Sequence, residues 1–295
     1  MGAVWKDVIG YGKETTYGQA ATTIDRWVRF RGGFKIIPKR EKIDLSGTEE
    51  HRSQIEMVGG NIAVEGEISD IEMLPDHFQG ILEGALGSKS GSTFKVVDGN
   101  LPSYTFVISY GGLLYKIVGC KIRSLSIEAE AGSILKASVG IVGKKPVDIS
   151  NLPSRSYSDK LPFVCYKATL TWGGSSVRCQ RASVSIENSL RYPFWELGDL
   201  YSANPSEGLA SVTGSFRALW DSKEEFEDFL NCQRRALVIT AQTAAGDQIE
   251  MKMSNVELTD FDFDRGDQDY DQTLNFKALY DESDASPIVV TVTTV

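Results

Sequence analysis

The residues whose spacing could do chemistry are three aspartates near the end of the chain, Asp260, Asp262 and Asp264, followed by Gly266. This spacing resembles the start of a calcium-binding loop, whose oxygen ligands lie two residues apart. The glycine of such a loop would fall one position earlier, at Arg265. A phenylalanine separates each pair of aspartates, and such alternation is typical of a β-strand with one wet and one buried face. We therefore expect an acidic strand face here, and neither a metal site nor a cofactor.

Groups that could serve an enzyme are scarce. The only histidines are His51 and His77, and neither has a cysteine or carboxylate at a spacing typical of zinc sites. The sequence contains no phosphate-binding GxxxxGK[ST] loop and no GxSxG elbow. Paired carboxylates could hydrolyse a glycosidic bond, but no aromatic platform for a sugar is evident beside the aspartates. We predict no catalytic residue and a protein that is not an enzyme.

The cysteines and the net charge exclude further classes of protein. The four cysteines form no CxxC pair, so we expect buried or idle thiols. A net charge of −9 and an isoelectric point near 4.9 argue against a basic clamp for nucleic acid. Because the sequence has no run of about 18 apolar residues, we expect no membrane partner.

Two similar hairpins would carry the acidic faces. In Gly119–Gly143 apolar and polar residues alternate on both sides of Gly132, which predicts a strand, a tight turn and a second strand. Val256–Leu279 has the same design around Gly266. Aligning the two glycines, an offset of 134 residues, places Glu128 on Asp262 and Glu130 on Asp264.

The rest of the chain also reads as two equivalent halves. Val64–Ile68 aligns with Val212–Phe216 at an offset of 148, and each half has one predicted helix, at Leu74–Gly87 and from Ser222 to Leu230. Glu225 makes the second helix start a capping box with Ser222, and Phe226, Phe229 and Leu230 are its expected apolar stripe. The proline- and serine-rich stretch Lys144–Leu161 predicts a boundary between domains 1–148 and 149–295.

Four segments are expected to be free of their own half. They are the arm Gly10–Ala20, the polar loop Asp44–Gln54, the long loop Glu187–Glu207 and the β-branched tail Pro287–Val295, which has no obvious partner strand. Long polar loops in compact domains are usually mobile or binding elements. We expect these segments to be ordered by neighbouring subunits.

Two of these stretches resemble tail tube proteins of long-tailed (siphovirus-like) bacteriophages, in the version with two tube domains. The phrase GYGKETTYGQA matches that family's opening at Gly10, Gly12, Glu14, Thr15, Thr16, Tyr17 and Gly18. The first hairpin matches the family's central hairpin at Gly119, Cys120, Ser124, Leu125, Ser126, Gly132 and Gly143. The second half contains no such phrase, so its assignment depends on the repeat.

The resemblance implies a mainly β protein with two tandem tail-tube β-sandwich or barrel domains, each flanked by one α-helix. It implies a structural virion protein, assembled in the host cytoplasm, whose rings stack into a hollow tube that carries the genome. A trimeric ring of two-domain chains would imitate a hexamer. Implied partners are other copies of the chain, a tape measure protein, tail tip or baseplate proteins, a tail terminator protein and passing DNA.

From these arguments we expect the acidic strand faces to line the tube and the free segments to contact neighbours. The lumen candidates are Glu128, Glu130, Asp260, Asp262 and Asp264. The contact candidates are Tyr11, Glu14, Tyr17, Asp44, Glu49, Glu50, Arg52, Tyr192, Trp195, Val289 and Val290. Two alternatives stay open: a carbohydrate-binding or hydrolytic β-sandwich, for which Trp172, Trp195 and Trp220 are the aromatic candidates, and another tail or neck ring component.

Overall fold

Two similar sets of β-strands make up the chain, and a computed structural model describes residues 7–45, 56–220, 223–265 and 270–295. All pairings between its named strands are antiparallel. The first half contains β1 (Val8–Lys13), β2 (Arg26–Trp27), β3 (Phe30–Leu45), β4 (Glu56–Glu72), α1 (Gln79–Leu86), β5 (Gly87–Ser90), β6 (Thr93–Val96), β7 (Tyr104–Tyr110), β8 (Leu113–Glu130), β9 (Lys136–Gly143) and β10 (Lys145–Asp148). The second half contains β11 (Val164–Trp172), β12 (Ser175–Val177), β13 (Cys179–Glu187), β14 (Ser211–Leu219), α2 (Glu224–Leu230), β15 (Arg234–Gln242), β16 (Gln248–Arg265), β17 (Tyr270–Ala278) and β18 (Val289–Thr293).

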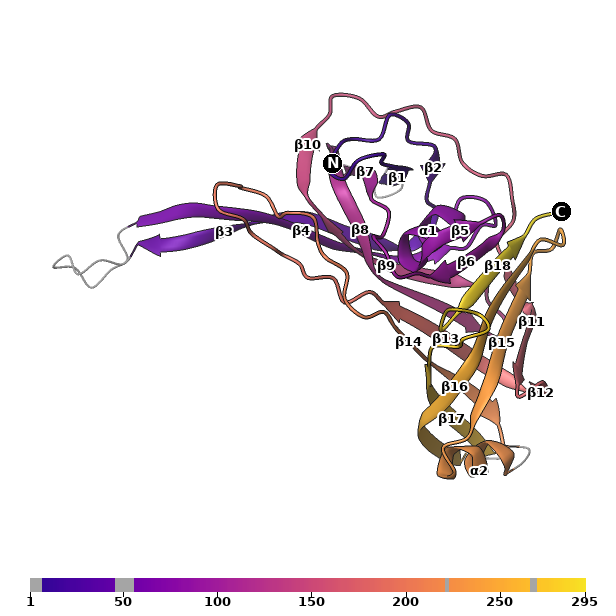
Figure 1. Cartoon of the computed structure of the whole chain (residues 1–295). Helices are drawn as coiled ribbons and strands as arrows, with labels where there is room; N and C mark the ends of the chain where they lie inside the picture. Colours follow the sequence, from indigo (N-terminus) through magenta and orange to yellow (C-terminus); the bar gives the residue numbers. More distant parts are fainter. Residues whose placement is uncertain (1–6, 46–55, 221–222, 266–269) are drawn as a thin grey trace.

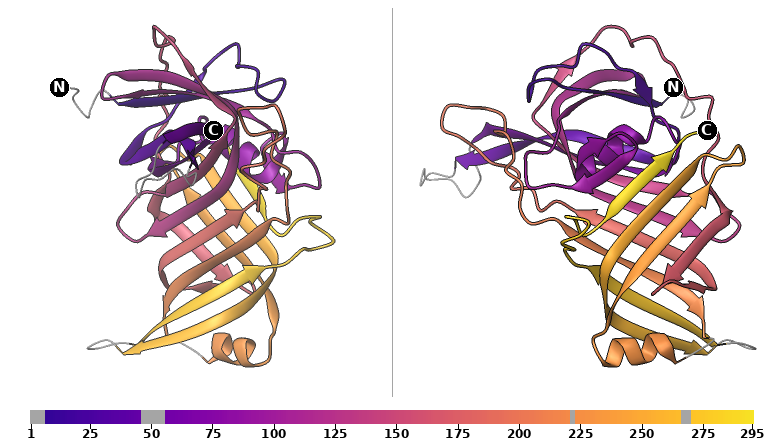
Figure 2. Two further views of the ribbon diagram at one scale, coloured as in Figure 1. Left: turned by 90° about the vertical axis from the view of Figure 1, so that its left-hand side faces the viewer. Right: turned by 45° about the vertical axis from the view of Figure 1, so that its right-hand side comes forward.

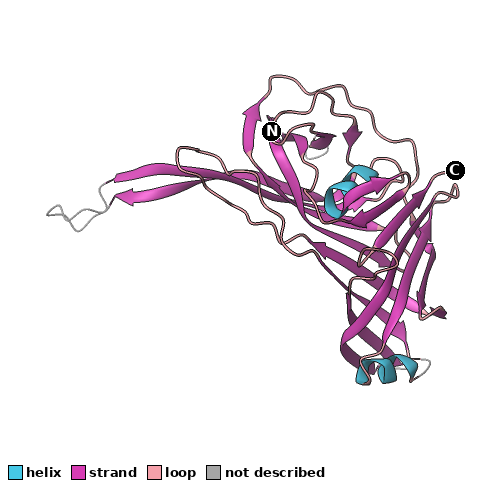
Figure 3. Ribbon diagram, in the orientation of Figure 1, coloured by secondary structure: helices cyan, strands magenta, loops and turns pink. Residues whose placement is uncertain are grey.

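Eight strands form one continuous run across both halves, in the order β3-β4-β9-β8-β13-β14-β17-β16. We call this run the long sheet. Its apolar side is covered in each half by a second layer: β1, β7 and β10 against the start of β8, and β11, β15 and β18 against the start of β16. The mainly β fold expected from the sequence is therefore confirmed (Figures 1 and 3).

The strands β8 and β16 pass from the covering layer into the long sheet. Each is 18 residues long and shifts register once against its hairpin partner, between Ile122 and Ser124 in β8 and between Leu258 and Asp260 in β16. Such bulges bend a strand and increase its twist, which allows one strand to serve two layers. Side chains on the inward faces of both layers form a single apolar core.

The strand registers repeat from one half to the other. Ile36 lies opposite Gly66 in the first half, and Val184 lies opposite Gly214 in the second, so both strands shift by 148 residues (184 − 36 and 214 − 66). In the hairpins the register shift follows Ile122, opposite Ile141, in the first half and Leu258, opposite Phe276, in the second, an offset of 136 for the first strand (258 − 122). The offset of 134 expected from the glycines is therefore wrong by two residues. The register aligns Glu128 with Asp264, and Glu130 with Gly266, which lies outside the described residues.

The first helix is shorter than expected but ends as predicted. Helix α1 begins at Gln79, and the residues from Pro75 to Phe78 form turns. At its end Gly87 has φ 91°, the left-handed conformation that glycine adopts without a steric penalty. The inward face of α1 is fully covered, because Ile81, Leu82 and Ala85 are buried.

The second helix is less well covered. Helix α2 begins at Glu224 with Lys223 at the N-cap position, while Ser222 of the expected capping box lies outside the described residues. Phe229 packs against the core, but Leu230 is 61% exposed, so its place in an apolar stripe is wrong. Phe226 instead contacts Phe261 at the sheet edge.

Two ladders join the halves. The end of β8 pairs with β13, and β18 pairs with β6 as well as with β16 (Figure 2). The tail that lacked a partner in the sequence is thus a paired strand, which corrects the expectation that it is free. The stretch from Lys144 is also less open than expected, because β10 pairs with β8. The division into domains 1–148 and 149–295 stays a prediction.

The hairpin of β3 and β4 projects from the body of the molecule (Figure 1). Asp44 and Leu45, expected in a loop, belong to β3, and residues 46–55 lie outside the described residues. Toward its tip the hairpin carries exposed apolar side chains: Ile43, Leu45, Met57 and Val58.

Candidate assembly surfaces

The acidic side chains singled out from the sequence lie on one face of the long sheet. Core residues such as Leu125, Ile127, Leu258 and Phe276 occupy the opposite face. Because side chains alternate along a strand, the residues between them point away from the core. We call this side the polar face. Glu128, Glu130, Asp260, Asp262 and Asp264 lie on it or at its end, and all are exposed.

The polar face is not purely acidic. Arg181 on β13 lies 3.4 Å from Glu128 on the neighbouring β8, and Arg217 on β14 lies 2.7 Å from Asp271 and 3.8 Å from Asp264. Cross-strand pairs of this kind, exposed to water, each contribute only about 0.2–1 kcal/mol. Their effect is to keep each arginine beside a carboxylate, so that these cations are not free.

The three aspartates lie in the strand β16 and not in a loop. Asp260 and Asp262 each accept a hydrogen bond from the backbone N–H of the following phenylalanine. Within the described residues no group of three or more metal-ligating side chains converges. The alternating strand pattern, rather than a calcium loop, accounts for their spacing.

The ladder between β8 and β13 is the closed junction of the long sheet. It pairs seven residues of each strand, from Arg181 opposite Glu130 to Glu187 opposite Ser124. On the core side it buries Ile127 against Val184, so that Ile127 is only 2% exposed. Backbone hydrogen bonds and a continuous apolar layer therefore join the two halves.

The two ends of the long sheet are open. In the described part of the chain β3 pairs only with β4, and residues 258–265 of β16 pair only with β17. Phe263, which aligns with Ile127 at the offset of 136, is 45% exposed. An unpaired edge with half-exposed apolar residues is a template for a further strand.

The aromatic residues beside this edge form a cluster around Trp220. Trp220 contacts Phe226, Phe261 and Phe263 with interplanar angles of 62–85°, so these rings meet edge to face. Phe263 also stacks on Tyr270 at an interplanar angle of 17°, and the rings of both are about half exposed. Trp172 is buried, and Trp195 lies in the loop after β13.

The N-terminal stretch expected to be a free arm is built into the first half. Residues 8–13 form β1, and Tyr11, 1% exposed, donates its hydroxyl hydrogen to the carbonyl oxygen of His77. Burial raises the pKa of Tyr11 strongly, which keeps the hydroxyl protonated. Because Tyr11 has almost no accessible surface, its assignment as a contact residue is wrong.

Glu14 is likewise an internal residue, 6% exposed. Its carboxylate accepts hydrogen bonds from the hydroxyls of Ser103 and Thr105 and from the backbone N–H groups of Gly18 and Gly119, at 2.8–3.0 Å. A buried carboxylate needs such donors to offset the loss of water. Glu14 therefore ties the N-terminal segment to β7 and β8, which corrects its assignment to an interface.

Tyr17 extends this arrangement toward the loop after β13. The ammonium groups of Lys121 and Lys144 each lie 5.7 Å from the centre of its ring. Lys121, itself buried, pairs with Glu207 of that loop at 2.5 Å. Burial alone would raise the pKa of Glu207, but hydrogen bonds from Lys121 and from the backbone of Leu101 outweigh it and lower the pKa.

The loop after β13 is held by Tyr192. Its hydroxyl oxygen lies 3.0 Å from the carbonyl oxygen of Val64 and 2.9 Å from that of Gly143, so its one hydrogen can be donated to either, and it accepts a hydrogen bond from the backbone N–H of Val64 at 2.5 Å. The loop also runs beside β4 at Tyr201, which forms a bridge with Ile62. Tyr192 is thus engaged within the chain, whereas Trp195 remains partly exposed.

The other contact candidates are divided between paired and open positions. Val290 is buried, and Val289 lies beside it in β18, paired on both sides. Asp44 is exposed near the tip of the β3–β4 hairpin. Glu49, Glu50 and Arg52 lie outside the described residues.

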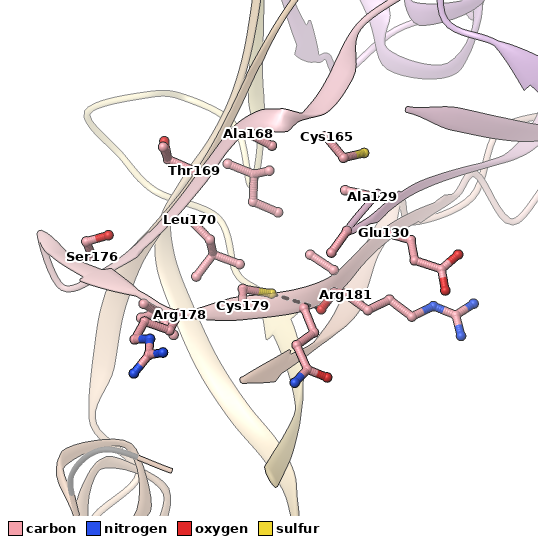
Figure 4. A pocket seen from close by; sticks show the side chains of 15 residues that line it. Ala129, Glu130, Cys165, Ala168, Thr169, Leu170, Ser176, Arg178, Cys179 and Arg181 are labelled. Carbon is pink, nitrogen blue, oxygen red and sulfur yellow. Dashed lines mark hydrogen bonds between the residues drawn. The ribbon is translucent and has the colours of Figure 1, made fainter. Parts of the chain in front are cut away.

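A cavity of about 250 Å³ lies between β11, β13 and the end of β8 (Figure 4). Two thiols line it, Cys165 and Cys179, and Cys179 donates to the carbonyl oxygen of Arg181 at 3.0 Å. Burial raises the pKa of Cys165 and raises that of Cys179 to about 11. Because the thiolate is the nucleophile, neither cysteine is activated at neutral pH.

The sequence reasoning missed the basic residues of the open edge. Lys35 and Lys39 on β3 are exposed and alternate with the buried Ile36 and the half-buried Pro38. The alternation is visible in the sequence, but only the fold shows that these lysines lie on an edge strand of the long sheet. An exposed lysine row on an edge strand is a recognisable signal, because it is one way to block unwanted pairing.

Comparison with known families agrees with this architecture. The family model for phage tail tube proteins matches residues 6–278. No curated protein matches the chain. Neither helix of the described residues is long and apolar enough to cross a membrane. The match spans both halves, including the N-terminal segment, both hairpins and both open edges, and the chain therefore belongs to the phage tail tube protein family.

Proposed function

We propose that copies of this chain join edge to edge into closed rings, and that the rings stack into the hollow tube of a phage tail. The observation that carries this proposal is the closed junction, in which β13 of the second half extends the sheet of the first at β8. The two ends of the long sheet are open edges, at β3 and at residues 258–265 of β16. A neighbour joined there in the same way would continue the sheet from chain to chain.

Such a contact is heterologous, because two different edges of the same chain meet, and it closes into a ring when the rotations add to a full turn. The family resemblance implies three chains per ring. Three chains with two four-stranded halves each give about 24 strands, and at about 4.8 Å per strand their perimeter is at least ~115 Å and the diameter roughly 37 Å. Barrels of only about 16–18 strands already enclose a water-filled channel.

The polar face would line this channel. DNA carries about one charge per 1.7 Å of duplex, and free lysine or arginine rows would bind it by releasing its counterions. Here Arg181 and Arg217 lie beside carboxylates, and the chain carries a net charge of −9. A lining that holds Arg181 and Arg217 in ion pairs and adds the acidic residues Asp260 and Asp262 would let DNA slide with little binding.

The β3–β4 hairpin is our candidate for contact between stacked rings. It projects beyond the body of the chain and exposes apolar side chains near its tip, including Ile43 and Met57 (Figure 1). Burying these side chains against a neighbouring ring would stabilise the contact by about 25 cal/mol for each Å² of apolar surface removed from water. A tape measure protein in the channel and tip, baseplate and terminator proteins at the ends would complete the tail of the virion.

We also infer that the two halves arose by duplication of one tube domain. Matching registers support this: Tyr11 opposite Phe106 corresponds to Trp172 opposite Leu237, and the covering strands shift register at equivalent places. A duplicated domain lets a ring of three chains present six equivalent modules.

Electron microscopy of the purified chain tests the proposed function. We expect rings and hollow tubes of uniform diameter, and mass measurements on isolated rings should give multiples of three chains. A protein that remains monomeric at high concentration, or that forms single rings and never tubes, would contradict the proposal. The second result would favour a neck ring component.

A further inference from the structure

We propose that residues 260–264 of β16 pair with residues 35–39 of β3 in a neighbouring copy in one defined register. In this register Lys35 lies opposite Asp264 and Lys39 lies opposite Asp260. We call this contact the seam. The inference rests on the proposed ring and adds to it which residues meet and what fixes their alignment.

The closed junction supplies the template. There Ser183 lies opposite Glu128 and Glu187 lies opposite Ser124. Moving the β13 positions back by 148 gives 35 and 39 (183 − 148 and 187 − 148), and moving the β8 positions forward by 136 gives 264 and 260 (128 + 136 and 124 + 136). Both offsets come from the ladders of the two halves, so the seam register involves no adjustable choice.

The apolar sides of the two edges agree with this register. It brings Ile36 opposite Phe263 and Pro38 opposite Phe261, all on the core side of the long sheet. In the closed junction the residue equivalent to Phe263 is Ile127, 2% exposed, whereas Phe263 is 45% exposed. A neighbouring β3 would cover Phe263 as β13 covers Ile127.

The charges select this register over its nearest competitors. A slip by one residue exchanges the core and polar faces and is excluded by burial. A slip by two keeps the faces but leaves one lysine–aspartate pair: Lys39 with Asp262 in one direction, or Lys35 with Asp262 in the other. Only the proposed register makes two opposite-charge pairs, and such pairs stabilise a ladder while like charges destabilise it.

Two matched cavities agree with a missing neighbour. The cavity at the closed junction takes one wall from Ala129, Glu130 and Ala131 at the end of β8. The hollow at the equivalent place in the first half is larger, about 600 Å³ against about 250 Å³. Residues of the first half such as Phe30 and Phe34 line it, together with Tyr157 from the segment between β10 and β11. Among the described residues, none of the strands β11 to β18 contributes to its lining. The end of β16 from a neighbour, at Arg265, would form the corresponding wall.

Pro38 fits the seam at a small cost. Proline has no backbone N–H, so it removes at most one hydrogen bond from a ladder, and prolines within sheets are found on edge strands. At an edge it also discourages pairing with unrelated strands. The lysines and the proline therefore let β3 accept an acidic partner strand while resisting others.

Disulfide trapping tests the register directly. In a background with the exposed Cys232 changed to serine, Ile37→Cys combined with Asp262→Cys places the two thiols opposite each other in the seam. Directly opposite residues have Cα atoms about 4.5–5.5 Å apart, within the range that a disulfide requires. Ile37→Cys with Asp260→Cys, and Ile37→Cys with Asp264→Cys, report the two slipped registers.

The closed junction provides the matched control for trapping. Ser126→Cys with Ser185→Cys occupies the equivalent pair inside one chain and should form an intramolecular disulfide. In oxidised tubes we expect the Ile37→Cys/Asp262→Cys protein to run as covalent multimers on non-reducing gels, at least fivefold more than either slipped pair. More cross-linking of a slipped pair, or none between chains while the control forms, would overturn the proposed register.

Charge reversal tests the ion pairs. Lys39→Asp alone and Asp260→Lys alone should each raise the protein concentration needed for tubes about tenfold, and the double variant should return to within about twofold of the original. The unfolding midpoint of the unassembled chain checks that each variant folds. Single variants that assemble normally, or a double variant that does not recover, would overturn the seam.

The two proposals fail in distinguishable ways. If the unmodified chain forms no tubes under the microscope, the proposed function fails and the seam fails with it. If tubes form but cross-links appear in a slipped register or charge reversal has no effect, the tube remains and only the seam is wrong.

Discussion

The two halves fasten their helices to the covering strands with different chemistry at equivalent positions. In the first half Tyr11 and Tyr104 donate to the backbone carbonyls of His77 and Gly80 beside and within α1, the second at 2.8 Å. In the second half Trp172, which aligns with Tyr11, donates to the carboxylate of Asp228 at 2.9 Å. Arg235, which aligns with Tyr104, also donates to Asp228, at 2.9 Å.

A single position on the helix explains this difference. Gly80 and Asp228 are 148 residues apart, the same offset as the neighbouring strands (228 − 80). At Gly80 the missing side chain leaves room for the ring of Tyr11, whereas Asp228 fills the space with an acceptor for two donors. The same backbone arrangement is therefore stabilised by neutral hydrogen bonds in one half and by a buried ion pair in the other.

The comparison teaches that the second half depends on one side chain. Helix α1 is also held by its buried apolar face, whereas Asp228 is the one buried residue that we find in α2. Removing Asp228 is expected to be more destabilising than removing one neutral hydrogen bond, because the buried Trp172 loses its acceptor and Arg235 keeps only its ion pair with Glu224, at 2.8 Å.

The largest effect is expected from Asp228→Ala. It should lower the free energy of unfolding by about 3 kcal/mol, less than a fully buried pair would lose because Arg235 is partly exposed. Urea unfolding of the unassembled chain measures it. Glu227→Ala, an exposed position on the same helix, is the matched control and should change the midpoint little. Equal losses of unfolding free energy in the two variants would contradict the proposed role of Asp228.

Gly80→Ala should be the most damaging single change in the fastening of the first half. The added Cβ would lie 2.5 Å from Arg26 Nη1 and 2.8 Å from Tyr11 Cε2. Overpacking of this kind costs about 1–3 kcal/mol, against a gain of at most ~1 kcal/mol in helix propensity. Thermal unfolding checks the prediction, with Gly99→Ala, whose Cβ meets nothing, as the control. A neutral or stabilising Gly80→Ala would show that α1 can move away freely.

Alkaline pH should weaken the fastening of the first half and leave that of the second unchanged. Burial raises the pKa of Tyr104 and Tyr11 far above the unfolded value of 10.0. A raised folded pKa gives stability that is complete below pH 10 and is lost above it, as the unfolded tyrosine ionises. The loss is about 1.4 kcal/mol per tyrosine by pH 11. Unfolding free energies at pH 8 and 11 measure it.

The variant Tyr11→Phe/Tyr104→Phe should lose less stability between these pH values than the unmodified chain. Asp228→Ala should keep the full alkaline loss, because it leaves Tyr11 and Tyr104 unchanged. A pH dependence that is the same in all three proteins would contradict the assignment to these tyrosines.

The smallest effect is expected from Tyr104→Phe at neutral pH. The variant keeps the ring and removes one buried hydrogen bond to Gly80, which should cost about 1 kcal/mol. Chemical denaturation measures the change. A loss as large as that of Asp228→Ala would show that the two halves are fastened equally strongly.

Much of the local structure followed from the sequence. Alternation around Gly132 predicted the first hairpin, and the spacing of Phe78, Leu82 and Gly87 predicted a helix with a left-handed end. These signals are local, because strand and helix periodicity and the freedom of glycine depend on residues close in sequence. The offset of 148 was also readable, since Val64–Ile68 and Val212–Phe216 share one pattern.

The sequence pattern could not give the exact offset between the two hairpins. Offsets of 134 and 136 differ by two, which is the period of a strand, so both keep every apolar residue on the core face. Only the position of the register shift in each hairpin decided between them: it follows Ile122 in the first half and Leu258 in the second. The same ambiguity would affect any alignment of two alternating strands from pattern alone.

The sequence by itself determined that this chain is a mainly β protein with alternating acidic strands and a tail tube signature. Tertiary structure alone decided that Glu14 is buried, because its donors at Ser103, Thr105 and Gly119 are about 90–105 residues away. It also decided that β18 is paired and that β3 and the end of β16 are the open edges. Whether a strand edge is free depends on which distant segments reach it, and that information lies in the packing of the whole chain.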